Sequence, residues 1–236
     1  MLDLEKETNE MLEFVDENIT SIQWTRKQND IDNSMLPNVY NIRSGKELID
    51  ILDEKGVFGN DRKYLIQRWL KVRNARMDEN MFCLCRNVRK NQNSKGDWDF
   101  ELDGVKVDLK STRFPQYLID KGERIEDYIS SKEKTVELIR YFYNNQTKNS
   151  EGSIREKYNS RLFLVHHSNF GEDRTHYLES YFKGKMPIIR WFCDSICELG
   201  WCQWSEDENS LSQVIYIVET EQGKLHFEYS DFIKFN

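Results

Sequence analysis

Apolar and charged residues alternate on both sides of the dipeptide Asp103-Gly104. Asp-Gly is a strong signal for a two-residue type I′ turn, because that turn needs a positive φ at both central positions. The alternation and the turn together predict a β-hairpin over residues 97–110. A two-residue turn fixes the strand register and pairs Leu102 with Val105, Glu101 with Lys106, Phe100 with Val107, Asp99 with Asp108, Trp98 with Leu109 and Asp97 with Lys110.

The predicted hairpin has two chemically different faces, because side chains alternate between the faces of a strand. One face is apolar and should pack on a core; it comprises Trp98, Phe100, Leu102, Val105, Val107 and Leu109. The other face is ionisable throughout; it comprises Asp97, Asp99, Glu101, Lys106, Asp108 and Lys110.

Apolar residues at helical spacing predict amphipathic helices over residues 3–17, 62–85 and 131–145. Ser44 and Glu47 form a capping-box pattern that opens a short helix ending near Lys55. We expect Asp61 to cap the helix over residues 62–85. An apolar run over residues 187–199 predicts a further helix, with Pro187 in its first turn, where a missing N–H is tolerated.

Short β-like runs predict strands over residues 161–166, 213–220 and 224–229, the last two as a hairpin. Helices followed by a hairpin, a helix, a strand, a helix and more strands suggest an α/β fold with a mixed central sheet flanked by helices. We divide the chain into an N-terminal helical extension, residues 1–60, and a core, residues 61–236, within one compact domain overall.

Composition narrows the class of protein. The chain has 236 residues, of which 38% are hydrophobic and 13% aromatic, which is enough for a packed core. The first 17 residues lack the layout of a signal peptide, and no apolar run approaches the 18 residues of a membrane span. Five cysteines without a secretion signal favour a reduced, cytoplasmic compartment.

Charge is distributed unevenly along the chain. The net charge is −7, yet residues 62–95 hold ten lysines and arginines against only Asp78 and Glu79. Such a block can steer a polyanion to one face of the molecule, although a solvated helix face would also explain it. The residues of this block that we expect to contact nucleic acid are Arg68, Lys71, Arg73, Arg76, Arg86, Arg89, Lys90 and Lys95.

The Asp99–Asp108 pair carries the chemistry. Residues directly opposite each other in a hairpin have Cβ atoms about 4.5–5.5 Å apart, where like charges are destabilising. A divalent cation would remove this conflict, because Mg²⁺ prefers carboxylate oxygens. Lys110 lies on the same face, where it can orient an attacking water or stabilise charge on a phosphate.

This arrangement resembles the PD-(D/E)XK nuclease superfamily, which includes restriction endonucleases, Holliday-junction resolvases and repair nucleases. The resemblance rests on Asp99, followed nine residues later by Asp108-Leu109-Lys110, and covers residues 79–113 closely. Members often carry another acid on the preceding helix, for which Glu79 is the first candidate and Asp78 the second. Trp98 stands where the family often has proline, and Asp97 is the alternative first acid if the turn is longer.

The resemblance implies a restriction-endonuclease-like fold and Mg²⁺-dependent hydrolysis of DNA that leaves a 5′-phosphate and a 3′-hydroxyl. Asp99, Asp108, Glu79 and the Leu109 carbonyl would hold the metal, for which Mn²⁺ would substitute, and Lys110 would position the water. We expect double-stranded DNA as substrate, a homodimer that cuts both strands, and a bacterial or phage source. RNA or branched DNA as substrate, a catalytically silent nucleic-acid-binding module and a non-enzymatic interaction protein remain alternatives.

Two other groups of residues have structural explanations. His166 and His167 close a predicted strand, so we interpret them as a satisfied strand-end pair. Some nucleases of the superfamily hold an iron–sulfur cluster with one upstream cysteine and three downstream. Here Cys193, Cys197 and Cys202 have a different spacing, and the first two lie at helical i, i+4 spacing. We therefore expect buried core thiols and no iron–sulfur cluster.

Overall fold

The computed structural model describes residues 2–18, 39–93, 98–146, 160–204, 210–221, 224–226 and 233–235. Its helices are α1 (Leu2–Asn18), the 3-10 helix η2 (Val39–Asn41), α3 (Gly45–Glu54), α4 (Gly59–Cys83), α5 (Gln116–Asp120), α6 (Ile125–Ile129), α7 (Lys132–Gln146), α8 (Glu172–Ser180) and α9 (Phe182–Leu199). Its strands are β1 (Val88–Lys90), β2 (Phe100–Leu102), β3 (Val105–Arg113), β4 (Ser160–Ser168), β5 (Cys202–Gln203), β6 (Leu211–Glu221) and β7 (Lys224–His226).

The strands form one mixed sheet in the order β1-β2-β3-β4-β6-β5, and β7 also pairs with β6. Strands β1, β2 and β3 are antiparallel neighbours, whereas β3, β4 and β6 run parallel to one another. Strands β5 and β7 pair antiparallel with β6. The predicted mixed sheet with flanking helices is therefore confirmed.

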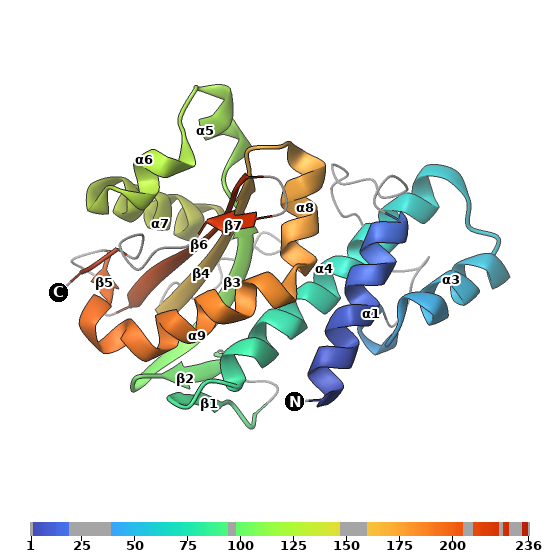
Figure 1. Cartoon of the computed structure of the whole chain (residues 1–236), viewed down its shortest axis with the longest axis horizontal. Coiled ribbons are helices and arrows are strands. Elements are labelled where there is room, and N and C mark those ends of the chain that lie inside the picture. Colours follow the sequence, from blue (N-terminus) through green and yellow to red (C-terminus); the bar gives the residue numbers. More distant parts are fainter. Residues whose placement is uncertain are drawn as a thin grey trace.

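Helices cover both faces of the sheet (Figure 1). On one face, Leu162, Leu164, Ile215 and Ile217 of the central strands belong to the hydrophobic core that includes α4 and α9. On the other face, the intervening residues of the same strands, Phe163, Val165, Val214 and Tyr216, belong to a second core with α5, α6 and α7. The central strands are thus buried on both sides, as parallel strands with helical crossovers usually are.

Local predictions hold over most of the described chain. The predicted helices correspond to α1, α3, α4, α7 and α9 within a few residues, and the predicted strands to the hairpin, β4, β6 and β7. The Ser44 hydroxyl accepts the Glu47 N–H at 3.2 Å, as the capping box requires. The polar segment 144–160 begins in the last turn of α7 and ends at Ser160 of β4, and residues 147–159 lie outside the described residues.

Two predictions about helix ends are wrong. Helix α4 begins earlier, with Phe58 as its N-cap, so Asp61 lies in the first turn, where an acid favours the helix dipole. Helix α9 begins at Phe182, which places Pro187 inside it. The apolar run that predicted α9 starts only at Pro187, so the polar first turns gave no signal.

The sequence did not predict β1, β5, α5, α6 or α8, which are short or polar.

The N-terminal helices share a hydrophobic core with the rest of the described chain: Phe14 of α1 packs edge-to-face on Trp69 of α4, with ring centroids 5.3 Å apart. Leu48 and Leu52 of α3 are buried in the same cluster. The division at residue 60 stays a prediction. Within the described residues, no helix is long and apolar enough to cross a membrane.

Candidate active site

The hairpin turn is the predicted one. Asp103 and Gly104 have φ values of 50° and 78°, as a type I′ turn requires. The register pairs Leu102 with Val105, Glu101 with Lys106 and Phe100 with Val107, as predicted. Phe100, Leu102 and Val107 are fully buried against α4 and α9, so the apolar face anchors the hairpin to the core.

The regular ladder ends at Asp99. Its backbone N–H donates to the Val107 carbonyl at 2.8 Å, so that Asp99 and Phe100 both face Val107. Two residues opposite one is the pattern of a β-bulge, which re-aims side chains and is frequent beside active sites. Residues that precede the bulge therefore point to the opposite face from the one predicted. Trp98, which we expected on the apolar face, lies under the Lys106 ammonium, so that prediction is wrong.

The predicted catalytic residues line one cleft between α4 and β3, which we call the hairpin cleft. Its volume is about 450 Å³. Residues Glu79, Asp99, Asp108, Leu109 and Lys110 all line it, and the basic side chains Lys71 and Arg76 form part of the same wall. Residues 79 and 110 are distant in the sequence, so this convergence depends on how α4 packs across the hairpin.

Asp99 is held by the backbone of the neighbouring strand. Its Oδ2 atom accepts the Leu109 N–H at 2.7 Å, which fixes the carboxylate at the mouth of the bulge. Burial raises the pKa of the Asp99 carboxyl above its ordinary value, and the Leu109 N–H opposes this shift. The neighbouring carboxylates Asp108 and Glu79 raise the same pKa further, while Lys110 lowers it.

Asp108 is compensated by two cations of the protein itself. The Lys110 ammonium donates to Asp108 Oδ1 at 2.5 Å, and Arg161 Nε lies 3.5 Å from Asp108 Oδ2. Arg161 is the β4 residue paired with Asp108, its side chain is 3% exposed, and its guanidinium stacks over the Tyr143 ring at 4.6 Å. The predicted pairing of Asp99 with Asp108 is therefore wrong, because the bulge places Asp99 opposite Val107 and its carboxylate binds the Leu109 N–H.

Glu79 and Asp78 point in different directions from α4. Glu79 lines the hairpin cleft and pairs with Lys90, at 3.3 Å. Asp78 is fully buried and pairs with the ammonium of Lys185, which is also fully buried. Glu79 is thus the acid available to the cleft, and Asp78, the second candidate, belongs to the interior.

The donor set of the hairpin cleft fits a hard divalent cation. Asp99, Asp108 and Glu79 supply carboxylate oxygens and Leu109 a backbone carbonyl, which are the ligand types that Mg²⁺ selects. Burial is the main cause of the raised pKa of Asp99, and the neighbouring carboxylates of Asp108 and Glu79 add to it. In the described part of the chain, however, no three acidic, imidazole or thiol side chains are already gathered closely enough to hold a metal ion.

The basic block is divided between surface and interior. Lys71, Arg76, Arg86, Arg89 and Lys90 are exposed, and Arg68 is half-buried. Arg73 is only 5% exposed, and its guanidinium pairs with Glu7 of α1, so the prediction that it contacts a phosphate is wrong. Lys95, like the alternative first acid Asp97, lies outside the described residues.

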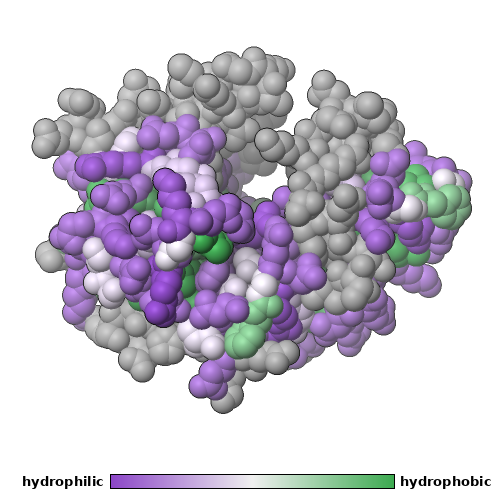
Figure 2. Space-filling model, turned by 90° about the horizontal axis from the view of Figure 1, so that it is seen from above, coloured by the Kyte–Doolittle hydropathy of each residue, from purple (hydrophilic) through white to green (hydrophobic). Residues whose placement is uncertain are grey.

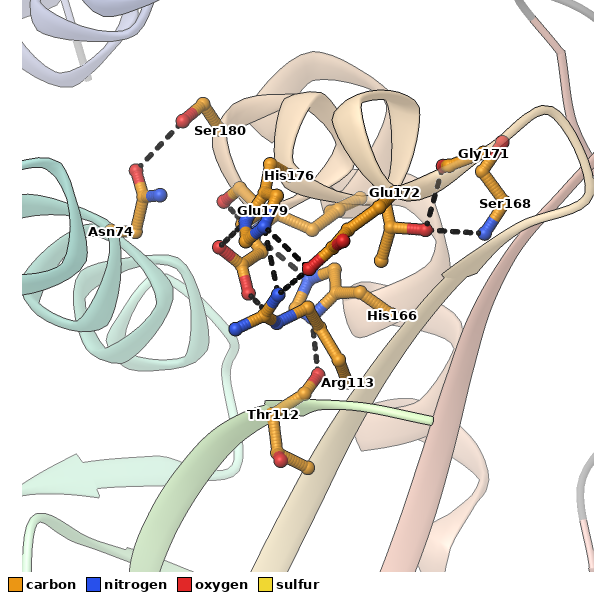
Figure 3. Close-up of polar contacts among 12 residues, drawn as sticks. Asn74, Thr112, Arg113, His166, Ser168, Gly171, Glu172, His176, Glu179 and Ser180 are labelled. Atoms are coloured by element: carbon orange, nitrogen blue, oxygen red, sulfur yellow. Dashed lines mark hydrogen bonds and ion pairs between the residues drawn. The ribbon is translucent and has the colours of Figure 1, made fainter. Parts of the chain in front are cut away.

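Sequence reasoning missed a partly buried charged network at the carboxyl end of β3 (Figure 3). Arg113 ends β3 and contacts three side chains of α8: Nη1 lies 3.4 Å from Glu172 Oε1 and 2.7 Å from His176 Nε2, and Nε lies 3.3 Å from Glu179 Oε1. Because the arginine donates to Nε2, His176 keeps its proton on Nδ1, 3.3 Å from Glu179 Oε2. His176 and its partners lower the pKa of Glu179 to about 2, against the effect of burial.

Lys185 extends this network toward the hairpin cleft. Besides pairing with Asp78, its ammonium donates to the Glu179 carbonyl at 2.7 Å and lies 3.5 Å from His166 Nε2. Three acceptors thus match its three protons. Neither Lys185 nor Arg113 lies in a recognisable motif, so nothing in the sequence indicated that these residues form a charged network.

The structural explanations of the histidine pair hold. His166 is fully buried and donates from Nδ1 to the Thr112 carbonyl at 3.0 Å, while His167 contacts Asn169 at 3.1 Å.

The burial of the cysteines differs in part from our expectation. Cys193 is buried, but Cys197 is exposed and donates to Asp103 at 3.3 Å, because it lies on the side of α9 turned toward the hairpin turn.

Comparisons of the chain with family models, with curated proteins and with solved structures returned no match.

Proposed function

We propose that this protein is a Mg²⁺-dependent endonuclease that hydrolyses DNA and leaves a 5′-phosphate and a 3′-hydroxyl. One observation carries the proposal: Glu79, Asp99, Asp108 and Lys110 line a single cleft together with Lys71 and Arg76. A helix that carries Glu79, a hairpin, crossover helices and a parallel strand follow in the order that the restriction-endonuclease-like resemblance implies.

In this proposal Asp99, Asp108, Glu79 and the Leu109 carbonyl hold the cation. A bound Mg²⁺ lowers the pKa of its water and polarises the scissile phosphate. The Leu109 N–H fixes the rotamer of Asp99, so this ligand is positioned before the cation arrives. Lys110 holds Asp108 in the free protein and becomes available to the water or the phosphate when the cation takes its place.

The exposed residues Lys71, Arg76, Arg86, Arg89 and Lys90 contribute contacts to phosphates that carry no sequence information. Cutting a duplex with one cleft per chain favours a homodimer, because a two-fold axis places one cleft on each strand. Mn²⁺ is expected to replace Mg²⁺.

One observation favours a second candidate, a catalytically silent nucleic-acid-binding module. Lys110 and Arg161 already neutralise Asp108 without a metal. A silent module would bind nucleic acid equally well with Mg²⁺ and with a chelator.

The deciding experiment incubates the protein with plasmid DNA, branched DNA, single-stranded DNA and RNA, each with Mg²⁺, Mn²⁺ or EDTA. We compare the wild type with Lys110→Ala and, as a matched control, with Lys106→Ala, which removes an exposed lysine of the same strand. The proposal expects metal-dependent cleavage that Lys110→Ala abolishes and Lys106→Ala preserves. Equal cleavage by all three proteins would contradict it, and preferential cleavage of RNA or branched DNA would identify another substrate.

A further inference from the structure

A second cleft lies at the carboxyl ends of β3 and β4. It has a volume of about 990 Å³, roughly twice that of the hairpin cleft. Its floor is formed by Phe114 and Pro115, which follow β3, and one wall by Ser168 and Asn169 at the end of β4. We call it the switch-point cleft.

The topology of the sheet creates this cleft. Strands β3 and β4 are parallel neighbours, but the chain leaves them toward opposite faces. After β3 it forms α5, α6 and α7, which belong to one hydrophobic core, and after β4 it forms α8 and then α9, which belongs to the other. Adjacent parallel strands whose connections diverge in this way open a crevice at their carboxyl ends, and α/β proteins bind ligands in such crevices.

The charges around the switch-point cleft are balanced. Its three carboxylates each have a basic partner: Glu123 pairs with Lys134 at 2.8 Å, Glu126 with Arg124 at 3.3 Å and Glu172 with Arg113 at 3.4 Å. Acids in the first turn of α8 also oppose an anion at that helix terminus. The cleft therefore suits an uncharged ligand better than a phosphate.

The lining suits a planar heteroaromatic ring. Phe114 and His167 meet edge-to-face, with centroids 5.7 Å apart, and burial lowers the pKa of His167, so its ring is neutral at pH 7. Gln116 and Asn169 place exposed amides at the rim, where Gln116 donates to Asp120 at 2.9 Å and Asn169 donates to Glu126 at 3.2 Å, so a bound base would exchange with these bonds. Amides paired with aromatic walls are the groups that bind an extruded base. Seen from above, the described surface is largely hydrophilic, with hydrophobic residues lying deeper between polar ones (Figure 2).

The two clefts follow one another along β3. Lys110 and Ser111 line the hairpin cleft, whereas Thr112 and Arg113 line the switch-point cleft. Two residues of strand correspond to about 6–7 Å. A nucleotide whose phosphate lies among Lys71, Arg76 and Lys110 therefore has the neutral cleft within reach of its base.

We propose that the switch-point cleft binds an unpaired nucleobase of the substrate strand, next to the phosphate held in the hairpin cleft. The inference rests on the proposed function and makes its substrate class more specific. A protein with this subsite should prefer duplexes with an unpaired nucleotide over fully paired DNA. Stacking of one base contributes enough to change an affinity about fivefold at the low end.

The test measures binding in EDTA, where cleavage does not interfere. The probes are a DNA duplex with one unpaired 2-aminopurine, the same duplex fully paired, and free 2-aminopurine deoxyriboside. The wild type should bind the first probe at least about fivefold more tightly than the second and should raise its fluorescence. Asn169→Ala and Gln116→Ala should each reduce this preference to less than about threefold.

Gln203→Ala is the control, since it removes an exposed amide from β5, at the other end of the sheet. Equal binding of both duplexes by the wild type would overturn the inference. The proposed nuclease function would not be affected, because plasmid cleavage tests it separately. Binding of the free deoxyriboside as tight as that of the unpaired duplex would also overturn it, because the ligand would then be a free nucleoside. Preferential binding without cleavage in Mg²⁺ would support the subsite and contradict the nuclease.

Discussion

The Leu109 backbone N–H donates to Asp99 Oδ2 at 2.7 Å, across the point where the hairpin ladder becomes irregular. In a regular hairpin, that N–H would pair with a carbonyl of the opposite strand. The bulge at Asp99 replaces this backbone bond with a bond from the side chain. An acidic side chain that is structurally fixed and lines a cleft with two further carboxylates is well placed to bind a cation.

Asp99→Asn should separate the structural role of this side chain from its charge. The amide oxygen of asparagine still accepts the Leu109 N–H, so the free energy of unfolding should change by less than about 1 kcal/mol. Loss of the charge should lower metal-dependent cleavage by more than about a hundredfold, because even outer-shell changes reach that magnitude. Urea denaturation and plasmid cleavage measure the two effects.

Asp97→Asn is the matched control for this prediction. Asp97 is the alternative first ligand, and it lies two residues from Asp99. If Asp99 is the ligand, Asp97→Asn should keep wild-type cleavage within about threefold. The reverse result, activity lost in Asp97→Asn and kept in Asp99→Asn, would assign the site to Asp97.

Arg161→Met should tighten divalent-cation binding. Arg161 places a positive charge 3.5 Å from an oxygen of Asp108, where it competes with a cation. Its removal should lower the dissociation constant for Mn²⁺ about tenfold, since tenfold corresponds to about 1.4 kcal/mol, which lies within the Coulomb repulsion expected at this range near a protein surface. Calorimetric titration with Mn²⁺ measures this without reference to activity. Arg140→Met removes an exposed arginine of α7 and should leave the constant unchanged; weaker binding in Arg161→Met would mean that the guanidinium positions Asp108.

Lys185→Met should destabilise the fold strongly. It leaves the Asp78 carboxylate buried without its cation, which typically costs about 3–5 kcal/mol. The double variant Asp78→Leu/Lys185→Met replaces both charges with apolar groups and should recover much of the loss. Lys183→Met changes an exposed lysine of the same helix and serves as control. Urea denaturation gives the free energies of unfolding; equal losses in the single and double variants would contradict this account of the pair.

Stability should fall on acidification from about pH 6.5, partly through His166. Burial and the nearby Lys185 lower the pKa of His166 to about 3, from an ordinary value of 6.5. Between these values the unfolded chain binds a proton that the folded chain does not, so stability is lost as the pH falls. One such proton amounts to about 2 kcal/mol between pH 6.5 and 5.

His166→Asn should reduce this pH dependence by about one proton. The asparagine amide can still donate to the Thr112 carbonyl, whereas it does not titrate. His167 and His176 also have lowered pKa values, and Glu179, with a pKa of about 2, adds a loss of stability below about pH 4.5. The diagnostic quantity is therefore the difference in pH dependence between the variant and the wild type. An unchanged slope of unfolding free energy against pH would contradict the assignment.

The sequence by itself determined the features that depend on neighbouring residues. The positive φ values of Asp103 and Gly104 follow from the turn they form, and the register of three residue pairs follows from that turn. The Ser44 cap and most helices follow from local spacing and composition. The same local pattern marked Asp108 and Lys110 as candidates, whereas Glu79 was a candidate only through the resemblance to the nuclease superfamily.

Only the tertiary structure decided what each charged residue does. Asp78 and Glu79 are adjacent in sequence, yet one pairs with Lys185, 107 residues away, and the other lines the cleft. Arg73 and Arg161 are buried because α1 and β3 supply their acidic partners. The switch-point cleft exists because two parallel strands send their connections to opposite faces. Such outcomes depend on which long-range surfaces pack together, and a local pattern of residues carries no record of that choice.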